Sequence, residues 1–162
     1  MPRLGSLIVC EKVIQDQLGK PTLISLFQKI SSVVPDGQQI PKGALAAIHW
    51  SAFSEWFFTK EELTKQWEQV LEVMLPDGSP SAIRGRLPLK ELAPLGQGSR
   101  SFINMMGIPV YLAGPLTINT WLEHNSERIT DVFSYVIMIE HTQQAPALND
   151  GGSVVMTTTP KQ

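Results

Sequence analysis

Short runs of β-branched and aromatic residues recur between turn residues along the chain, and no stretch keeps a 3.6-residue periodicity over several turns. Such runs are typical of strands, because branched and aromatic side chains pack well on a pleated surface. Their number and spacing match two antiparallel sheets packed face to face. The sequence therefore predicts an all-β fold: an antiparallel two-sheet β-sandwich, immunoglobulin-like or C2-like, of about seven to eight strands with one short helical insertion.

Turn residues between strand-like runs predict hairpins at three places. The first turn contains Gly19, which can take the positive φ of a tight turn. The second turn is Pro76-Asp77-Gly78-Ser79, and side chains alternate between apolar and polar on both sides of it. The third turn is Asn125-Ser126-Glu127-Arg128. The expected strand pairs are 7–14 with 22–33, 67–75 with 82–89, and 116–124 with 129–141.

The helical insertion is expected at residues 60–66. Thr59 is a candidate N-cap, and Glu62 three residues later completes a capping box. Phe58 and Leu63 have the spacing of a hydrophobic staple. One or two helical turns should therefore form here.

Residues 88–100 are predicted to connect the two sheets, since they contain two prolines and two glycines without any periodicity. One helical turn at residues 89–92 is a further expectation. The strand-like run from Ser101 to Met106 is then interrupted by Gly107 and Pro109, which is typical of a bulge or an edge strand.

The length of 162 residues at 17.9 kDa is that of one domain, which can bury about 68–70% of its unfolded surface. Hydrophobic residues at 43% and charged residues at 17% exclude an intrinsically disordered chain. We predict a β-sandwich domain over residues 1–141. Residues 142–162 are expected to be a tail of low complexity, either flexible or carrying one extra strand at residues 153–158.

Thirteen basic and fifteen acidic residues give a net charge of -2, which argues against a nucleic-acid-binding protein. A single cysteine cannot form an intrachain disulfide bond. The apolar run at residues 7–10 is too short for a signal peptide or a membrane span. We therefore expect a cytoplasmic protein that binds neither nucleic acid nor membrane.

The run Leu7-Ile8-Val9-Cys10-Glu11-Lys12-Val13, followed by Gly19-Lys20-Pro21-Thr22-Leu23-Ile24-Ser25-Leu26-Phe27, resembles the start of a family of small bacterial proteins of unknown function. In that family a Cys-acidic pair precedes a Gly-Lys turn and a strand ending in Phe. Residues 107–110 and 112–116 are similar to a second segment of the same family. The resemblance implies a bacterial β-sandwich, and it supplies no activity, ligand or catalytic residue.

Residues with catalytic or metal-binding chemistry are few and scattered. Cys10 lies in an apolar run, which favours a buried and inert thiol, although Lys12 shares its face. His124 and His141 would lie roughly 40 Å apart along the predicted hairpin at 3.3 Å per residue, so they cannot share a metal ion. The chain has no Gly-x-Ser-x-Gly motif. We expect no enzymatic activity, no metal and no cofactor.

Gly98, Ser99 and Arg100 form a weak anion-binding candidate, because two glycines, at positions 96 and 98, precede a basic residue. The segment lacks the Gly-Lys-Ser/Thr ending and the strand-to-helix context of a phosphate-binding loop. A flexible connection between sheets is the stronger interpretation of these residues.

Six of the twelve aromatic residues lie within residues 50–67. Three of them are consecutive and cannot all face one core, so the segment either folds over one end of the domain or forms an exposed contact surface. In the first case the segment is a lid that buries all of these aromatic side chains. In the second case it is a contact surface with a rim of Glu55, Lys60, Glu61 and Lys65 for a protein partner or a second copy, or alternatively for a sugar. The six are Trp50, Phe53, Trp56, Phe57, Phe58 and Trp67.

These observations predict a non-enzymatic protein-interaction or assembly module that uses a sheet edge and the aromatic segment. The alternative is a small-molecule or carbohydrate-binding sandwich that uses the same aromatic residues.

Overall fold

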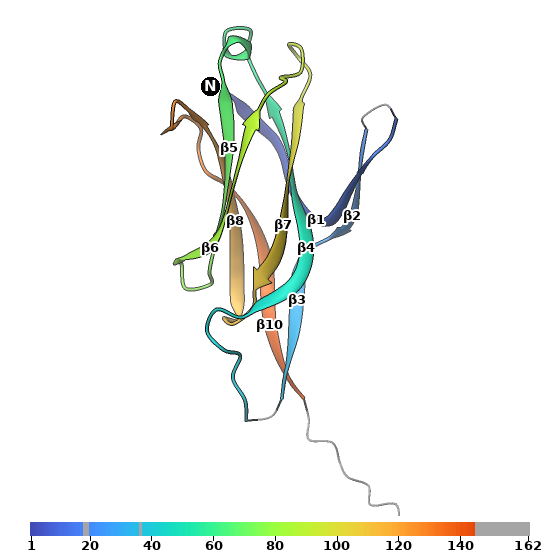
Figure 1. The fold of residues 1–162 in the computed structure, drawn as a ribbon, viewed down its shortest axis with the longest axis vertical. Helices are drawn as coiled ribbons and strands as arrows, with labels where there is room; N and C mark the ends of the chain where they lie inside the picture. Colours follow the sequence, from blue (N-terminus) through green and yellow to red (C-terminus); the bar gives the residue numbers. More distant parts are fainter. Residues whose placement is uncertain (18–19, 36, 145–162) are drawn as a thin grey trace, which may run out of the picture.

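A computed structural model of the protein describes residues 1–17, 20–35 and 37–144. The described chain is all-β, and its strands form two sheets (Figure 1). Gly19 and residues 145–162, which include the extra strand expected at 153–158, lie outside the described residues. Residues 142–144, predicted to start the tail, belong to the last strand instead. The strands are β1 Arg3–Gln15, β2 Pro21–Leu26, β3 Lys29–Pro35, β4 Leu45–Phe57, β5 Trp67–Met74, β6 Pro80–Leu89, β7 Ser99–Pro109, β8 Gly114–His124, β9 Glu127–Arg128 and β10 Phe133–Gln144.

The four-stranded sheet has the order β2-β1-β4-β7, and the six-stranded sheet has the order β3-β10-β8-β5-β6 with β9 attached to β8. The described residues therefore form ten strands, more than the seven to eight expected. The pairing of β3 with β10 is parallel, so the expectation of purely antiparallel sheets is wrong at this pair.

The predicted strand over residues 22–33 is two strands that belong to different sheets. β2 ends at Leu26 and β3 begins at Lys29, with Ser25 at a φ of 55° just before the change. The Phe27 amide still donates to Val9 in the four-stranded sheet at 3.0 Å, whereas the Gln28 carbonyl accepts from Met138 in the six-stranded sheet at 2.9 Å. No glycine or proline marks this crossover, and strand-like residues continue on both sides, so the sequence pattern hides it.

The second predicted hairpin is confirmed, because β5 and β6 pair antiparallel with Trp67 opposite Leu89. The third is confirmed in part. β10 does pair antiparallel with β8, but it starts only at Phe133, opposite Thr120. The turn after β8 first forms the short β9, with Asn125 and Ser126 at φ values of 52° and 64°.

The interrupted run at Gly107 and Pro109 belongs to β7, an end strand of the four-stranded sheet, as expected. Gly107 has a φ of 85°, and its carbonyl accepts a hydrogen bond from Trp50 Nε1 at 2.9 Å. Residues 90–98 connect β6 to β7 and so pass from one sheet to the other, also as expected. The helical turn expected at 89–92 is absent, since β6 continues to Leu89.

The expected helix at residues 60–66 is a single 3₁₀ turn, η1, at Glu62–Thr64, and the described residues contain no α-helix. Half of the predicted capping box forms, because Glu62 Oε2 accepts from the Thr59 amide at 2.7 Å. The turn ends at Lys65, whose backbone is extended. Trp67 already starts β5, which leaves no room for a second turn. Among the described residues, no helix has the length and apolar character needed to span a membrane.

The inner faces of the two sheets share a main hydrophobic core, which includes Trp50 and Val9 from one sheet and Leu71 and Ile137 from the other. A second cluster lies at the end of the molecule that carries η1. Its buried members are Trp56, Phe58, Trp67 and Leu122.

Candidate functional site

Five of the six aromatic residues predicted to form a contact surface are buried. Trp56 and Trp50 expose 0% and 1% of their surface, Trp67 exposes 3%, and Phe53 and Phe58 expose 6% each. The prediction of an exposed surface is therefore wrong for these five. The reason is that the middle of β4 is covered on both faces. Phe57 alone is half-buried, and its ring lies over Gly5 of the neighbouring strand, where a β-carbon would come within 2.4 Å of it.

The anion-binding candidate at Gly98, Ser99 and Arg100 is also wrong. Arg100 Nε donates to Glu55 Oε1 at 3.0 Å. A β-carbon on Gly98 would lie 2.6 Å from that same carboxylate oxygen. Ser99 is buried and its hydroxyl accepts from the Ala93 amide at 2.7 Å. A carboxylate thus occupies the place where an anion would bind.

Cys10, His124 and His141 have structural surroundings. Cys10 is fully buried, as predicted, and burial raises the pKa of its thiol. A ring nitrogen of His124 lies 2.8 Å from the Gln66 carbonyl, and one of His141 lies 2.6 Å from the Val110 carbonyl. Within residues 1–17, 20–35 and 37–144, no three His, Cys, Asp or Glu side chains come together as a metal site would require.

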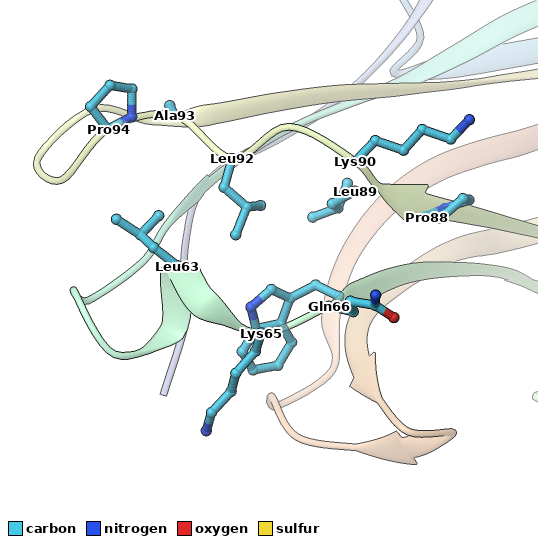
Figure 2. Close-up of a pocket in the computed structure, with 10 residues that line it drawn as sticks. Leu63, Lys65, Gln66, Pro88, Leu89, Lys90, Leu92, Ala93 and Pro94 are labelled. Atoms are coloured by element: carbon cyan, nitrogen blue, oxygen red, sulfur yellow. The ribbon is translucent and has the colours of Figure 1, made fainter.

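The main candidate site is a cleft of about 580 Å³ at the end of the molecule that carries the second cluster. The η1 segment forms one wall, and the end of β6 with the β6–β7 connection forms the other (Figure 2). Figure 2 shows Leu63, Leu89 and Leu92 pointing into the space between the two walls. The lining is Leu63, Lys65, Gln66, Trp67, Pro88, Leu89, Lys90, Leu92, Ala93 and Pro94.

Hydrogen bonds fix the η1 wall in position. Trp67 Nε1 donates to the Glu62 carbonyl at 2.9 Å, and the Leu63 amide donates to the Thr59 carbonyl at 3.1 Å. Burial raises the pKa of the Glu62 carboxyl, but the Met1 amino group at 2.5 Å and the Thr59 amide outweigh this and lower it below the ordinary value. Glu62 is therefore held as a carboxylate behind this wall.

The opposite wall is fixed by its attachment to the sheets. Leu89 lies opposite Trp67 in the β5–β6 ladder, which sets the floor of the cleft. The Ala93 amide donates to the buried Ser99 hydroxyl at 2.7 Å, and the Gln97 amide donates to the Pro94 carbonyl at 2.9 Å. Both walls are thus built on defined contacts to the two sheets.

The charge at the cleft comes from Lys65 and Lys90. Both side chains are exposed, and Figure 2 shows them extending away from the leucines at the margins of the cleft. Neither forms an ion pair with a described residue. The lining side chains include no carboxylate, imidazole, thiol or hydroxyl group. An apolar floor between unpaired cations is suited to holding a ligand.

Sequence reasoning found one wall of this cleft and missed the other. Leu63, Lys65 and Trp67 belong to the segment that was singled out for its aromatic residues. The sequence pattern predicts a short helical turn at residues 89–92, which contain Leu89 and Leu92, and no wall of a cleft. One signal in the sequence could have identified this wall. Leu89 and Leu92 are large apolar residues close to Lys90, in a connecting segment without the period of a strand.

A charged network covers part of the outer face of the six-stranded sheet. Arg86 donates to Glu123 Oε2 at 2.8 Å and also pairs with Glu68. Glu123 Oε1 accepts from Trp121 Nε1 at 2.9 Å, and the Arg84 guanidinium lies 5.9 Å from the Trp121 ring centre. Burial alone would raise the pKa of Glu123, but the Trp121 and Arg86 hydrogen bonds lower it below the ordinary value.

This network predicts a dependence of stability on pH. A carboxyl whose pKa is lowered by folding stabilises the folded state above its unfolded pKa, and this contribution is lost as pH falls through the folded pKa. Glu123→Gln should therefore cost about 1 kcal/mol at pH 7 and flatten the decline in stability below about pH 4.5. Urea unfolding at a series of pH values measures this. The exposed Glu127→Gln is the control, and an equal flattening in both variants would contradict the assignment.

No protein-family model matches this chain, and no curated protein is significantly similar to it, so its resemblance to a bacterial family of unknown function stays a prediction.

Proposed function

We propose that this chain is a cytoplasmic, non-enzymatic protein-interaction module on a β-sandwich of immunoglobulin-like or C2-like class. It docks a segment of a protein partner in the cleft between η1 and the β6–β7 connection. The observation that carries this proposal is the combination of an apolar floor with two unpaired lysines at its margins. The occupant that complements both features is a peptide segment with one large apolar side chain flanked by Asp or Glu.

The size and chemistry of the cleft support such an anchor. A volume of about 580 Å³ lies within the range of binding pockets and accommodates a leucine or aromatic side chain with its neighbours. Burial of that side chain against Leu63, Leu89 and Leu92 would supply most of the affinity, as anchor residues do at interfaces. Exposed lysines add little direct energy, but they steer an acidic partner and orient it.

A small amphipathic carboxylate is the second candidate ligand, because the cleft volume also fits a molecule of that size. A sugar is a poorer fit, since stacking on a sugar needs an exposed aromatic face. Trp67, the one aromatic residue of the lining, exposes only 3% of its surface.

Selection from a phage-displayed library of random peptides tests the proposal. We expect enriched peptides to combine an apolar residue with acidic residues. Their binding, measured by fluorescence anisotropy, should weaken at least tenfold in Lys65→Glu/Lys90→Glu, about 1.4 kcal/mol or more, because two attractive charges become repulsive. Leu92→Asp, which places a charge among the leucines, should abolish it. The matched control is Lys20→Glu/Lys42→Glu, which reverses two exposed lysines outside the cleft and should leave binding unchanged.

Three results would count against this proposal. They are a selection without enrichment, enriched peptides that lack acidic residues, and binding that is equal in the cleft and control variants. Decanoate serves as the small-molecule probe. If its binding perturbs backbone NMR signals at Leu63 and Leu92 while no peptide binds, the cleft belongs to a small carboxylate and the protein-partner proposal fails.

A further inference from the structure

Two neighbouring hollows lie at the end of the molecule opposite η1, outside the cleft (Figure 1). Their volumes are about 310 Å³ and about 460 Å³, which lie within the range of small-molecule sites. Gln39 and Ile40 from the β3–β4 connection line both hollows, and so do Tyr111 and Leu112 from the β7–β8 connection. The two hollows therefore form one continuous groove, which we call the end groove.

Main-chain hydrogen bonds hold the walls of the end groove in place. The Val110 amide donates to the Ala44 carbonyl at 3.2 Å, which ties the β7–β8 connection to the start of β4. The Ala44 amide donates to the Pro41 carbonyl at 3.0 Å, and the Leu75 amide donates to the Ser79 carbonyl at 2.8 Å in the β5–β6 turn. The fold thus positions the walls before any ligand binds.

The smaller hollow contains several uncharged groups that can form hydrogen bonds. Gln38, Gln39 and Gln143 each contribute a side-chain amide, and Tyr111 contributes a phenol. None of these four side chains forms a hydrogen bond with a described residue. An amide both donates and accepts, which complements sugar hydroxyl groups, since each of these also does both. Tyr111 is half-buried and gives the groove an aromatic residue against which a sugar ring can pack.

The larger hollow contains two opposite charges that do not form an ion pair. Lys42 and Asp77 both line this hollow, and neither pairs with a described residue. Hydrogen bonds from Ser79 lower the pKa of Asp77 below its ordinary value, and the positive charge of Lys42 contributes to the same direction. A hydroxyl group can accept from Lys42 and donate to Asp77, whereas either charge would repel a ligand of its own sign. This hollow therefore favours a ligand that is polar and neutral.

We propose that the end groove binds a neutral disaccharide, with one sugar ring in each hollow and the linkage beside Tyr111. The amides of the smaller hollow bind hydroxyl groups of one ring, and Lys42 and Asp77 bind hydroxyl groups of the other. Ile40 and Leu112, which both hollows share, pack against the carbon-bound hydrogens. The amides are exposed to water before binding, so each gains little and the affinity is weak. This site shares no residue with the cleft near η1.

Backbone NMR titration with defined disaccharides at millimolar concentration tests the proposal. The probes are cellobiose, lactose, mannobiose and N,N′-diacetylchitobiose, which differ in their linkages and in the arrangement of their hydroxyl groups. We expect at least one of them to shift the amide signals of Gln39 and Leu112 in a saturable way. The signals of Leu63 and Leu92 should stay unchanged, which separates this site from the cleft.

Substitutions then identify the groups that bind the sugar. Tyr111→Ala should weaken binding about tenfold or more, because a ring that serves both hollows is lost. Gln39→Ala should weaken it about fivefold through the loss of hydrogen bonds, and this exposed position carries little risk to folding. The matched control is Gln97→Ala, which removes an exposed amide in the β6–β7 connection and should leave binding unchanged. Circular dichroism shows that each variant keeps its strand content.

Four outcomes would overturn this proposal. The first is the absence of saturable shifts with all four probes, and the second is an equal effect of Gln39→Ala and Gln97→Ala. The third is a stronger response to digalacturonate, which carries two carboxylates, than to any neutral probe. The fourth is a set of shifts centred on Leu63 and Leu92, which would place the sugar in the cleft.

Discussion

Replacement of Trp56 by alanine is expected to lower the free energy of unfolding by about 3–5 kcal/mol, the usual cost of truncating a large core aromatic residue. Trp56 is completely buried in the second cluster, and its ring meets Phe133 edge-on with 5.8 Å between ring centres. Its Nε1 also donates to Gln69 Oε1 at 3.4 Å. Alanine would leave a cavity that strands of both sheets line and cannot easily close.

Urea unfolding followed by far-UV circular dichroism measures this loss without depending on tryptophan fluorescence. Phe57→Ala is the control in the adjacent position, and its cost should be clearly smaller because Phe57 is only half-buried. A loss below about 1 kcal/mol for Trp56→Ala would mean that the second cluster is not tightly packed.

Substitution of Gln69 by leucine is expected to cost about 3 kcal/mol, although it exchanges a polar side chain for an apolar one of similar size. Gln69 is fully buried between the sheets. Its Nε2 donates to Ser54 Oγ at 2.8 Å and to Thr120 Oγ1 at 3.0 Å, and its Oε1 accepts from Ser101 Oγ at 2.5 Å. Leucine would leave several of these groups without partners, at about 1–3 kcal/mol each where they cannot rearrange.

The triple variant Gln69→Leu/Ser54→Ala/Ser101→Ala distinguishes a lost network from a simple packing defect. It removes two of the hydroxyl groups that Gln69→Leu alone would leave buried without a hydrogen-bond partner. The triple variant should therefore be more stable than Gln69→Leu. The exposed Gln66→Leu controls for the exchange itself and should change stability by less than about 0.5 kcal/mol. A triple variant that is less stable than Gln69→Leu would contradict this account.

The sequence predicted those parts of the fold in which one strand face is buried and the other is solvated. β6 shows this most clearly, since its exposed Arg84 and Arg86 alternate with half-buried residues on the other face. The β5–β6 hairpin and its turn were therefore found with nearly correct bounds. The position of β7 at a sheet edge was also predicted, because Gly107 and Pro109 restrict where that strand can lie.

The change of sheet after β2 could not be predicted, because Phe27 and Gln28 carry no turn signal. The parallel pairing of β3 with β10 was missed for a related reason: it joins segments far apart in the chain, and alternation along one strand does not identify its neighbour. Burial of the aromatic segment was one of two outcomes that the sequence left open, because a sequence pattern does not show that β4 is covered on both faces. There, aromatic residues such as Phe53 fill the outer layer and Trp56 the inner one.

The candidate site was predicted only in part, because a cleft is formed by segments that are distant in the sequence. Leu63 and Leu92 contribute to the same cleft although the whole β5–β6 hairpin lies between them. Local patterns can identify apolar residues in a connection. They do not show which of these residues face each other.

The parallel pair of β3 and β10 has a consequence for how the chain assembles during translation. Ile30 must find Ile139, a residue made more than a hundred positions later, before the six-stranded sheet is complete. Before β10 has been synthesised, the backbone of β3 has no strand to pair with in the six-stranded sheet. Contacts between residues so distant in the chain slow folding. We therefore expect β3 and β10 to pair only after most of the strands have left the ribosome.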